Sequence, residues 1–172
     1  ASAPMDNTVR ALIEHYGMVP LPVEGTYFVS TYRSAADAST SVGSGPVGTA
    51  MIGLYAAEPP SRSLFHRLAF DEVWHHYGGD PIRLVLLHTD GTNGEVTLGS
   101  DVLGGQAVQY VIPAGTWQAG ELAPGGTWAL FGCTMAPGFT GECFEGGTVS
   151  ALTATHPERA DDIRRLAVPD DH

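Results

Sequence analysis

The chain has 172 residues, which is enough to bury a core but too few for two ordinary domains, so we predict one domain over residues 1–172. Its 19 acidic residues face only 8 basic ones, all arginine, and the formal charge is −11. Such a surface repels nucleic-acid phosphates and anionic lipid headgroups, and a chain without lysine cannot form a Schiff base through a side-chain amine.

The first predicted element is a helix over residues 6–17. Val9, Leu12, Ile13 and Tyr16 fall on one face of such a helix, Asp6 can cap its start, and glycine follows Tyr16. The next stretch, GMVPLPVEG, contains two prolines and is predicted to be extended.

From TYFVSTYRS onward, the pattern becomes that of short strands separated by Gly, Pro, Asp or Asn. Residues 35–48 are small and polar and are predicted to form a flexible hairpin tip or a lid. Later apolar or aromatic runs predict strands in AMIGLYAA, SLFHRLAF, EVWHHY, IRLVLLH, EVTLG, VQYVIPAG, TWALFGCTM and residues 142–147. Eight or so strands at regular spacing are typical of an all-β sandwich or barrel, here with its core at about residues 20–150.

The C-terminal tail predicts one more helix. Thr155 and Glu158 form a capping box, proline occupies the first helical position, and Ile163 and Leu166 follow on one side. The fold class we expect is therefore all-β, with a short N-terminal helix and a C-terminal helical tail.

Cysteine content and apolar runs indicate the compartment. The chain has two cysteines and no CxxC motif, no signal-like N-terminal segment and no apolar run of membrane-spanning length. These features predict a cytoplasmic protein without membrane or nucleic-acid partners.

The most informative stretch is SLFHRLAFDEVWHHYGGDPIRLVLLH, which holds four of the seven histidines. Side chains alternate along a strand, so Glu72, Trp74 and His76 would share one face. A carboxylate and an imidazole left unpaired in a dry core would cost some kcal/mol, so this face is predicted to line a wet cavity. The competing interpretation places His75 and His76 on the surface and Glu72 at a solvated edge.

The same stretch resembles the first sequence motif of the cupins, G-x5-H-x-H-x3 or x4-E-x6-G. His66 matches the first histidine, Glu72 the glutamate and Gly79 the closing glycine, whereas Leu68 replaces the second histidine. The second cupin motif is echoed in PAGTWQ, where Gln118 stands in place of the last histidine.

A longer resemblance, over roughly residues 8–147, is to the fifth cupin family, a group of mostly uncharacterised proteins. It rests on GTYFVSTYRS, SLFHRL, DEVWHHYGGDP, YVIPAGTWQAGEL and GCTMAPGF in this order. The resemblance implies a double-stranded β-helix, or cupin jelly roll, usually assembled as a homodimer. It also implies a relation in fold to dTDP-4-keto-6-deoxyhexose 3,5-epimerases.

No cofactor is predicted, although a divalent metal stays open as an alternative. A tight site needs three or four converging ligands, and the neutral amide of Gln118 is a poor replacement for imidazole. If a metal were bound, its ligands would be His66, Glu72, His76 and Gln118.

Without a metal, the same groups suit proton transfer. His66 or His76 would be the base, Glu72 or Asp71 its orienting partner, and a nearby donor would meet the developing enolate oxygen. The predicted catalytic residues are thus His66, Glu72 and His76. The residues predicted to position the ligand are Arg33, Ser63, Arg67, Trp74, Trp117 and Gln118. Arg33 has two interpretations, an inward clamp for a carboxylate or phosphate and a salt bridge at the rim.

The sequence favours a small-molecule enzyme of the isomerase or epimerase type, acting by acid-base proton transfer on a carbonyl-bearing sugar or related polar metabolite. A non-catalytic cupin that binds a small ligand is the first alternative. A metal-dependent cupin oxygenase, lyase or decarboxylase is the second.

Overall fold

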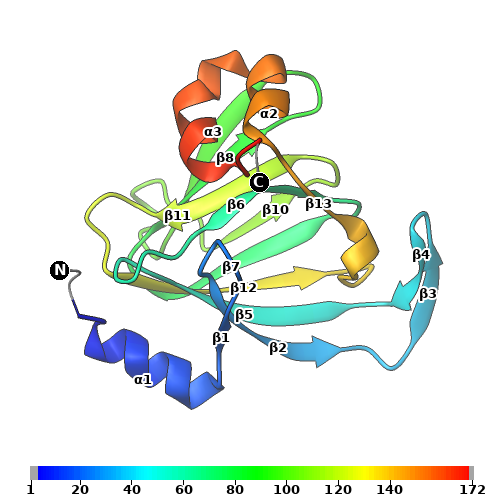
Figure 1. The fold of residues 1–172 in the computed structure, drawn as a ribbon. Coiled ribbons are helices and arrows are strands. Elements are labelled where there is room, and N and C mark those ends of the chain that lie inside the picture. The colour runs from blue at the N-terminus through cyan, green and yellow to red at the C-terminus, as the bar shows by residue number, and fades with distance from the viewer. Residues whose placement is uncertain (1–3, 171–172) are drawn as a thin grey trace.

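The computed structural model of the chain describes residues 4–170, and it is a two-sheet β-barrel with helices outside it (Figure 1). Its strands are β1 (Val19–Pro20), β2 (Tyr27–Arg33), β3 (Asp37–Thr40), β4 (Gly43–Pro46), β5 (Thr49–Ala56), β6 (Ser63–Leu68), β7 (Glu72–Gly79), β8 (Ile82–Leu87), β9 (Asn93–Leu98), β10 (Gln109–Ile112), β11 (Trp117–Leu122), β12 (Trp128–Met135) and β13 (Phe144–Gly146). The helices are α1 (Asn7–Tyr16), α2 (Val149–Thr155) and α3 (Ala160–Leu166), with 3-10 turns at Gly141–Cys143 and Pro157–Arg159.

All strands except β3 and β4 form two antiparallel sheets that face each other. One sheet has the order β1-β2-β5-β12-β7-β10 and the other β13-β6-β11-β8-β9, as the jelly-roll prediction requires. Their inner faces enclose a core that includes Tyr55, Trp74, Leu84 and Phe131. The two sheets are also joined by single bridges, Gly25 with Arg62 on one side and Leu98 with Ala107 on the other.

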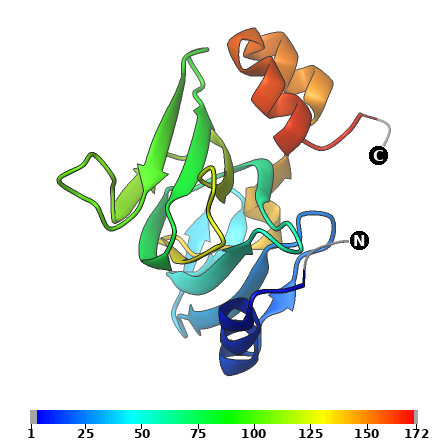
Figure 2. The ribbon, with the colours of Figure 1, turned by 90° about the vertical axis from the view of Figure 1, so that its left-hand side faces the viewer.

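The helices cover the outer faces of the two sheets on opposite sides of the barrel (Figures 1 and 2). Helix α1 packs Val9 against the outside of the six-stranded sheet, next to Leu54. Helices α2 and α3 pack Leu152, Ile163 and Leu166 against the outside of the five-stranded sheet. Among the described residues, no helix is both long and apolar enough to cross a membrane.

The N-terminal helix confirms its prediction. The carboxylate of Asp6 accepts hydrogen bonds from the backbone of Thr8 and Val9, and Gly17 ends the helix with a φ of 65°, in the left-handed region that glycine adopts readily.

The prediction that a capping box at Thr155 starts the last helix is wrong. Thr155 is the final residue of α2, and its hydroxyl donates to the carbonyl of Leu152, one turn earlier. Proline follows two residues later and cannot continue a helix, so a 3-10 turn separates α2 from α3. The sequence pattern also missed α2 itself.

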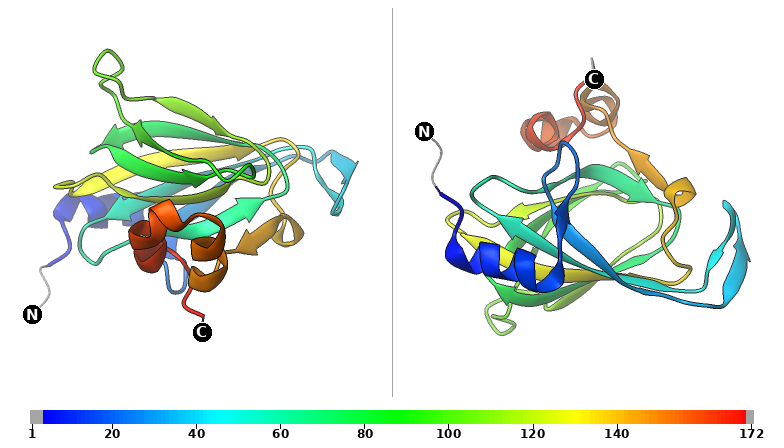
Figure 3. Two further views of the ribbon diagram at one scale, coloured as in Figure 1. Left: turned by 90° about the horizontal axis from the view of Figure 1, so that it is seen from above. Right: turned by 60° about the horizontal axis from the view of Figure 1, so that its bottom comes forward.

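Residues 35–48 contain the short hairpin β3–β4, one of the two forms predicted for them, and it projects from the barrel (Figures 1 and 3). Strand β11 lies at the centre of the five-stranded sheet, although residues 116–122 had not been predicted as a strand. Its glycine and two polar side chains, Gln118 and Glu121, weaken the apolar pattern, but its pairing with β6 and β8 buries it.

Candidate functional site

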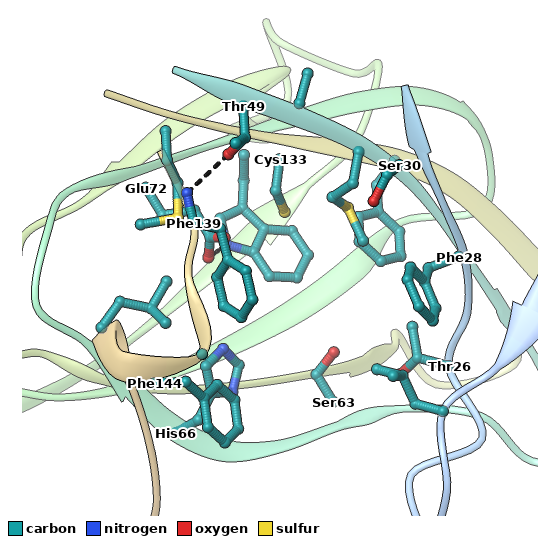
Figure 4. Close-up of a pocket in the computed structure, with 18 of the residues that line it drawn as sticks. Thr26, Phe28, Ser30, Thr49, Ser63, His66, Glu72, Cys133, Phe139 and Phe144 are labelled. Carbon is teal, nitrogen blue, oxygen red and sulfur yellow. Dashed lines mark hydrogen bonds between the residues drawn. The ribbon is translucent and has the colours of Figure 1, made fainter. Parts of the chain in front are cut away.

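A cavity of about 690 Å³ lies between the sheets, a size typical of small-molecule sites (Figure 4). Its lining is largely apolar and rich in aromatic rings. The lining residues are Leu21, Pro22, Glu24, Thr26, Phe28, Ser30, Tyr32, Arg33, Thr49, Ala50, Met51, Ser63, His66, Leu68, Glu72, Trp74, Phe131, Cys133, Met135, Phe139, Gly141 and Phe144.

Cross-strand register arranges the inward side chains of the six-stranded sheet in rows. We call the row at one end of the cavity the Glu72 row; it runs across β2, β5, β12 and β7 through Arg33, Thr49, Met135 and Glu72. The next row inward runs through Ser30, Met51, Cys133 and Trp74. All eight side chains line the cavity.

A β-bulge in β6 turns two polar side chains into the cavity. His66 pairs with Gln118 and Ser63 pairs with Gly120, so three steps along β6 oppose two along β11. Strict alternation would place residues 63 and 66 on opposite faces, and the extra residue of a bulge reverses that parity. Ser63 and His66 therefore both face the cavity.

The imidazole of His66 is held in a single orientation. Its Nδ1–H donates to the backbone carbonyl of Leu64 at 2.7 Å, and its ring stacks on Phe144 with a centroid distance of 5.2 Å. Since a carbonyl can only accept, the proton of the neutral ring sits on Nδ1 and the lone pair on Nε2. Burial lowers the pKa of His66 below 6.5, although the hydrogen bond to Leu64 opposes this effect. Neutral imidazole is thus the favoured form near neutral pH.

The pKa of the Glu72 carboxyl group is shifted in the opposite direction, upward. Glu72 is 9% exposed, and burial raises its pKa from 4.5 to about 7, against hydrogen bonds from Gln118 and Trp74 that lower it. The indole N–H of Trp74 lies 3.1 Å from Glu72 Oε1 and 3.0 Å from Gln118 Oε1 and donates to both. Gln118, which is 1% exposed, thus lies behind Trp74 and Glu72.

His76 does not line the cavity, contrary to the expectation that it converges with Glu72. It pairs with Phe131, and its Nε2 hydrogen-bonds the carbonyl of Asp80 at 2.9 Å. The ring of Phe131 stacks on Trp74 at 4.8 Å and fills this end of the barrel. His66, Glu72, His76 and Gln118 are therefore not four groups around one space.

The remaining predicted ligand contacts divide into two groups. Arg33, Ser63 and Trp74 line the cavity, and the hydroxyls of Ser63 and Tyr55 hydrogen-bond at 2.5 Å. Arg67 and Trp117 do not line it; the guanidinium of Arg67 lies 4.7 Å from the ring centre of Trp117 and forms an ion pair with Glu145. The functional roles of all these residues stay predictions.

Several lining residues were not predicted from the sequence, most notably Glu24 and Cys133. Glu24 accepts a hydrogen bond from the backbone N–H of Leu64, and burial raises its pKa. Burial and then the charge of Glu72 raise the pKa of the Cys133 thiol, which keeps it in its unreactive neutral form. Strand alternation from Glu72 and Trp74 could not reach these residues, because they lie about 50 residues upstream and 60 downstream.

The metal set that the cupin motifs suggest does not fit these residues. Leu68 supplies no donor atom, and the amide oxygen of Gln118 already accepts from Trp74. Within residues 4–170, no three His, Cys, Asp or Glu side chains gather in a way that could hold a metal ion. Near the Glu72 row, the lining supplies one imidazole, that of His66, and one carboxyl group, that of Glu72. Such a pair is suited to proton transfer.

Comparison with known families and structures gives one consistent result. Residues 10–146 match the model of the family Cupin_5, described as Cupin superfamily (DUF985). No curated protein sequence matches the chain.

Two solved structures are similar over nearly the whole chain. A hypothetical protein from Leishmania major has 29% sequence identity and a TM-score of 0.85, covering 94% of this chain and 99% of its own. A protein from Shewanella oneidensis has 27% identity and a TM-score of 0.83, covering 96% and 100%. A cupin 2 conserved barrel domain protein from Rhodopseudomonas palustris, at 14% identity and a TM-score of 0.54 over 87% of both chains, shares the fold.

Proposed function

The chain belongs to the Cupin_5 family of the cupin superfamily, and we propose that its cavity is the active site of an isomerase- or epimerase-like enzyme. The reaction is the transfer of a proton at a carbon next to a carbonyl group in a small molecule. The observation that carries this proposal is that burial shifts the pKa values of two groups in one apolar cavity in opposite directions, His66 downward and Glu72 upward.

The order of the two pKa values assigns the roles. Between a value below 6.5 for His66 and about 7 for Glu72, the main form of the site has a neutral imidazole and a protonated carboxyl group. The reverse form, with imidazolium and carboxylate, is a minor species at every pH. His66 is therefore the base and Glu72 the acid in the reaction.

The reaction follows from these protonation states. Nε2 of His66 takes the proton from the carbon, and the electron pair of that C–H bond forms the C=C bond of an enol. The carboxyl group of Glu72 gives its proton to the carbonyl oxygen as its charge develops. The imidazolium of His66 then returns the proton to the same carbon, and Glu72 takes its proton back from the enol oxygen as the C=O bond forms again. If the enol turns over in the cavity first, the proton adds to the opposite face and the centre is epimerised. If the reacting carbon carries a hydroxyl group, His66 can instead give the proton to the former carbonyl carbon while Glu72 takes the proton of that hydroxyl, which becomes the new carbonyl, and the result is an isomerisation.

Trp74 and Gln118 position the acid. Their contacts hold Glu72 in the wall of the cavity rather than in a rotamer exposed to solvent. The indole N–H also stabilises the carboxylate that forms when Glu72 gives up its proton.

The lining argues for a less polar substrate than a sugar. The walls of the cavity include Phe28, Met51 and Phe139, none of which can hydrogen-bond the hydroxyls of a sugar through its side chain. Unpaired hydroxyls in such a site would lose their hydration without replacement. We therefore propose a carbonyl compound with an apolar body.

The test is carbon-bound hydrogen exchange in D₂O, followed by NMR. The purified protein is incubated at pH 6.5 with a panel of aryl and alkyl ketones, aldehydes and keto acids, and loss of the α-proton signal is measured. Glu72→Gln and His66→Asn should each reduce the exchange rate of an active compound about 100-fold or more. His75→Asn is the matched control, because His75 bonds Thr134 and does not line the cavity.

The alternative of a binding protein has a distinct signature. The apolar, aromatic lining would also suit storage of a ligand, and a compound that stabilises the protein without any exchange of its protons would favour that function. Full exchange activity in both Glu72→Gln and His66→Asn would contradict the assignment of the acid and the base.

The homodimer and the cytoplasmic location stay proposals. Gel filtration with light scattering tests the homodimer.

A further inference from the structure

We propose that Arg33 forms a carboxylate-binding subsite at the cavity mouth, and that the substrate is a monocarboxylate whose apolar body extends from Arg33 toward Glu72. The substrate class rests on the proposed function, whereas the subsite can be tested without turnover. The observation that supports the subsite is that the cation Arg33 and the candidate acid Glu72 lie in the same row of one sheet.

Arg33 is a free cation in a strongly acidic protein. The chain has 8 arginines against 19 acidic residues. Five of the arginines form ion pairs with carboxylates, namely Arg67, Arg83, Arg159, Arg164 and Arg165. Arg33 lines the cavity, yet over residues 4–170 its guanidinium forms neither an ion pair nor a side-chain hydrogen bond. A salt bridge at the rim was the other interpretation of Arg33, and within residues 4–170 no such salt bridge forms. The five N–H donors of the Arg33 guanidinium are therefore available to a ligand.

The Glu72 row sets the distance between the two groups. Arg33 pairs with Thr49, Thr49 with Met135, and Met135 with Glu72, so three strand spacings separate the ends of the row. At about 4.8 Å per spacing, the backbones are roughly 14 Å apart along the sheet. Both residues line the cavity on the same face of the sheet, the exposed Arg33 at its mouth and the buried Glu72 in its wall. One small molecule can therefore contact both.

The distribution of charge sets the direction of binding. The other ionisable groups that line the cavity are Glu24, Tyr32, His66, Glu72 and Cys133, and none of these is a fixed cation. An anion placed deep in the apolar cavity would lose its hydration without meeting a cation, whereas at Arg33 it gains paired, charge-assisted hydrogen bonds. A single arginine balances one negative charge, which favours a monocarboxylate over a phosphate dianion.

The rim provides the surface for the apolar body. Tyr32, Phe139 and Phe144 line the mouth and are unusually exposed for aromatic residues, at 58%, 44% and 44%. The backbone N–H of Phe139 donates to Thr49 Oγ1 at 2.9 Å, which ties the rim to the Glu72 row (Figure 4). A ligand held by Arg33 would cover these rings and place its carbonyl carbon toward His66 and Glu72.

The experiment compares two unreactive probes of equal shape, 3-phenylpropanoate and 3-phenylpropanamide. Their dissociation constants are measured by calorimetry or ligand-detected NMR with the wild type, Arg33→Met and Arg164→Met. We expect the wild type to bind the acid about ten-fold more tightly than the amide, as one charge-assisted contact provides. Arg33→Met should remove this preference, and Arg164→Met, which loses an exposed ion pair on α3, should keep it.

The outcomes separate this inference from the proposed function. Equal binding of the two probes by the wild type, no binding of the acid, or an acid preference that survives Arg33→Met would each overturn the subsite. If Arg33→Met removes the preference while no keto acid exchanges its protons, the subsite stands and the proposed enzymatic function falls. If keto acids exchange no faster than neutral ketones while the probes behave as expected, the substrate class is overturned and the subsite stands.

Discussion

The two ends of the barrel interior are built on the same three strands, β5, β12 and β7, yet one is solid and the other hollow. At the solid end, Phe131 stacks on Trp74 and contacts Tyr55, with ring centres 4.8 and 4.6 Å apart. Its ring lies directly over Gly53, where an added Cβ would come within 2.3 Å of it. At the hollow end, the positions on β12 that match Phe131 carry the narrower side chains of Cys133 and Met135. The comparison teaches that side-chain size at inward positions, rather than the backbone, determines where this barrel is hollow.

The largest expected effect comes from breaking the solid end. Phe131→Ala should lower the free energy of unfolding by about 3–5 kcal/mol, because a fully buried ring is removed and the rigid sheets cannot close the void. Met51→Ala, at the hollow end, should cost less than about 2 kcal/mol, because its side chain is smaller and only partly buried. Urea denaturation measures both values. Equal losses would show that the two ends are packed alike.

The second prediction concerns the buried acid of the hollow end. The pKa of Glu72 is raised in the folded state, so between pH 4.5 and about 7 the folded protein holds a proton that the unfolded chain has lost. The wild type should therefore lose stability as the pH rises through this window, by about 3 kcal/mol in total. Glu72→Gln should lack this loss and gain relative stability at pH 8. A difference between the two unfolding free energies that does not change with pH would contradict the raised pKa.

The third prediction tests the hydrogen-bonding indole that joins the two ends. Trp74→Phe keeps an aromatic ring beside Phe131 but removes the N–H that Glu72 and Gln118 share, which should cost about 2 kcal/mol of stability. The pKa of Glu72 should rise further, as NMR titration can measure. Trp128→Phe serves as the control because Trp128 packs on the α1 side of the sheet. A Glu72 pKa unchanged in Trp74→Phe would show that the indole does not stabilise the carboxylate.

The smallest effect is expected at the rim. Thr49→Val preserves shape but removes the acceptor for the Phe139 N–H, and the exposed position limits the cost to about 1 kcal/mol. Hydrogen exchange should accelerate at the Phe139 amide and stay unchanged at the amides of β12. Unchanged exchange at Phe139 would mean that this contact does not hold the rim.

Local sequence signals determined much of this protein. Short apolar runs separated by turn residues predicted most of the strands, the Asp6 and Gly17 caps bounded the first helix, and the spacing of His66 and Glu72 indicated the family and two residues of the cavity. These signals depend on neighbours within a few positions, which one sequence displays directly.

Only the tertiary structure decided which polar groups share the cavity. The bulge opposite Gln118 turns Ser63 inward together with His66, and Phe131, far along the chain, fills the space at His76. Glu24, Cys133 and Arg33 reach the same cavity through strand register across the sheets. Register and ring packing depend on residues that are distant in the chain, so alternation along one strand could predict the face of Glu72 but not the membership of the site.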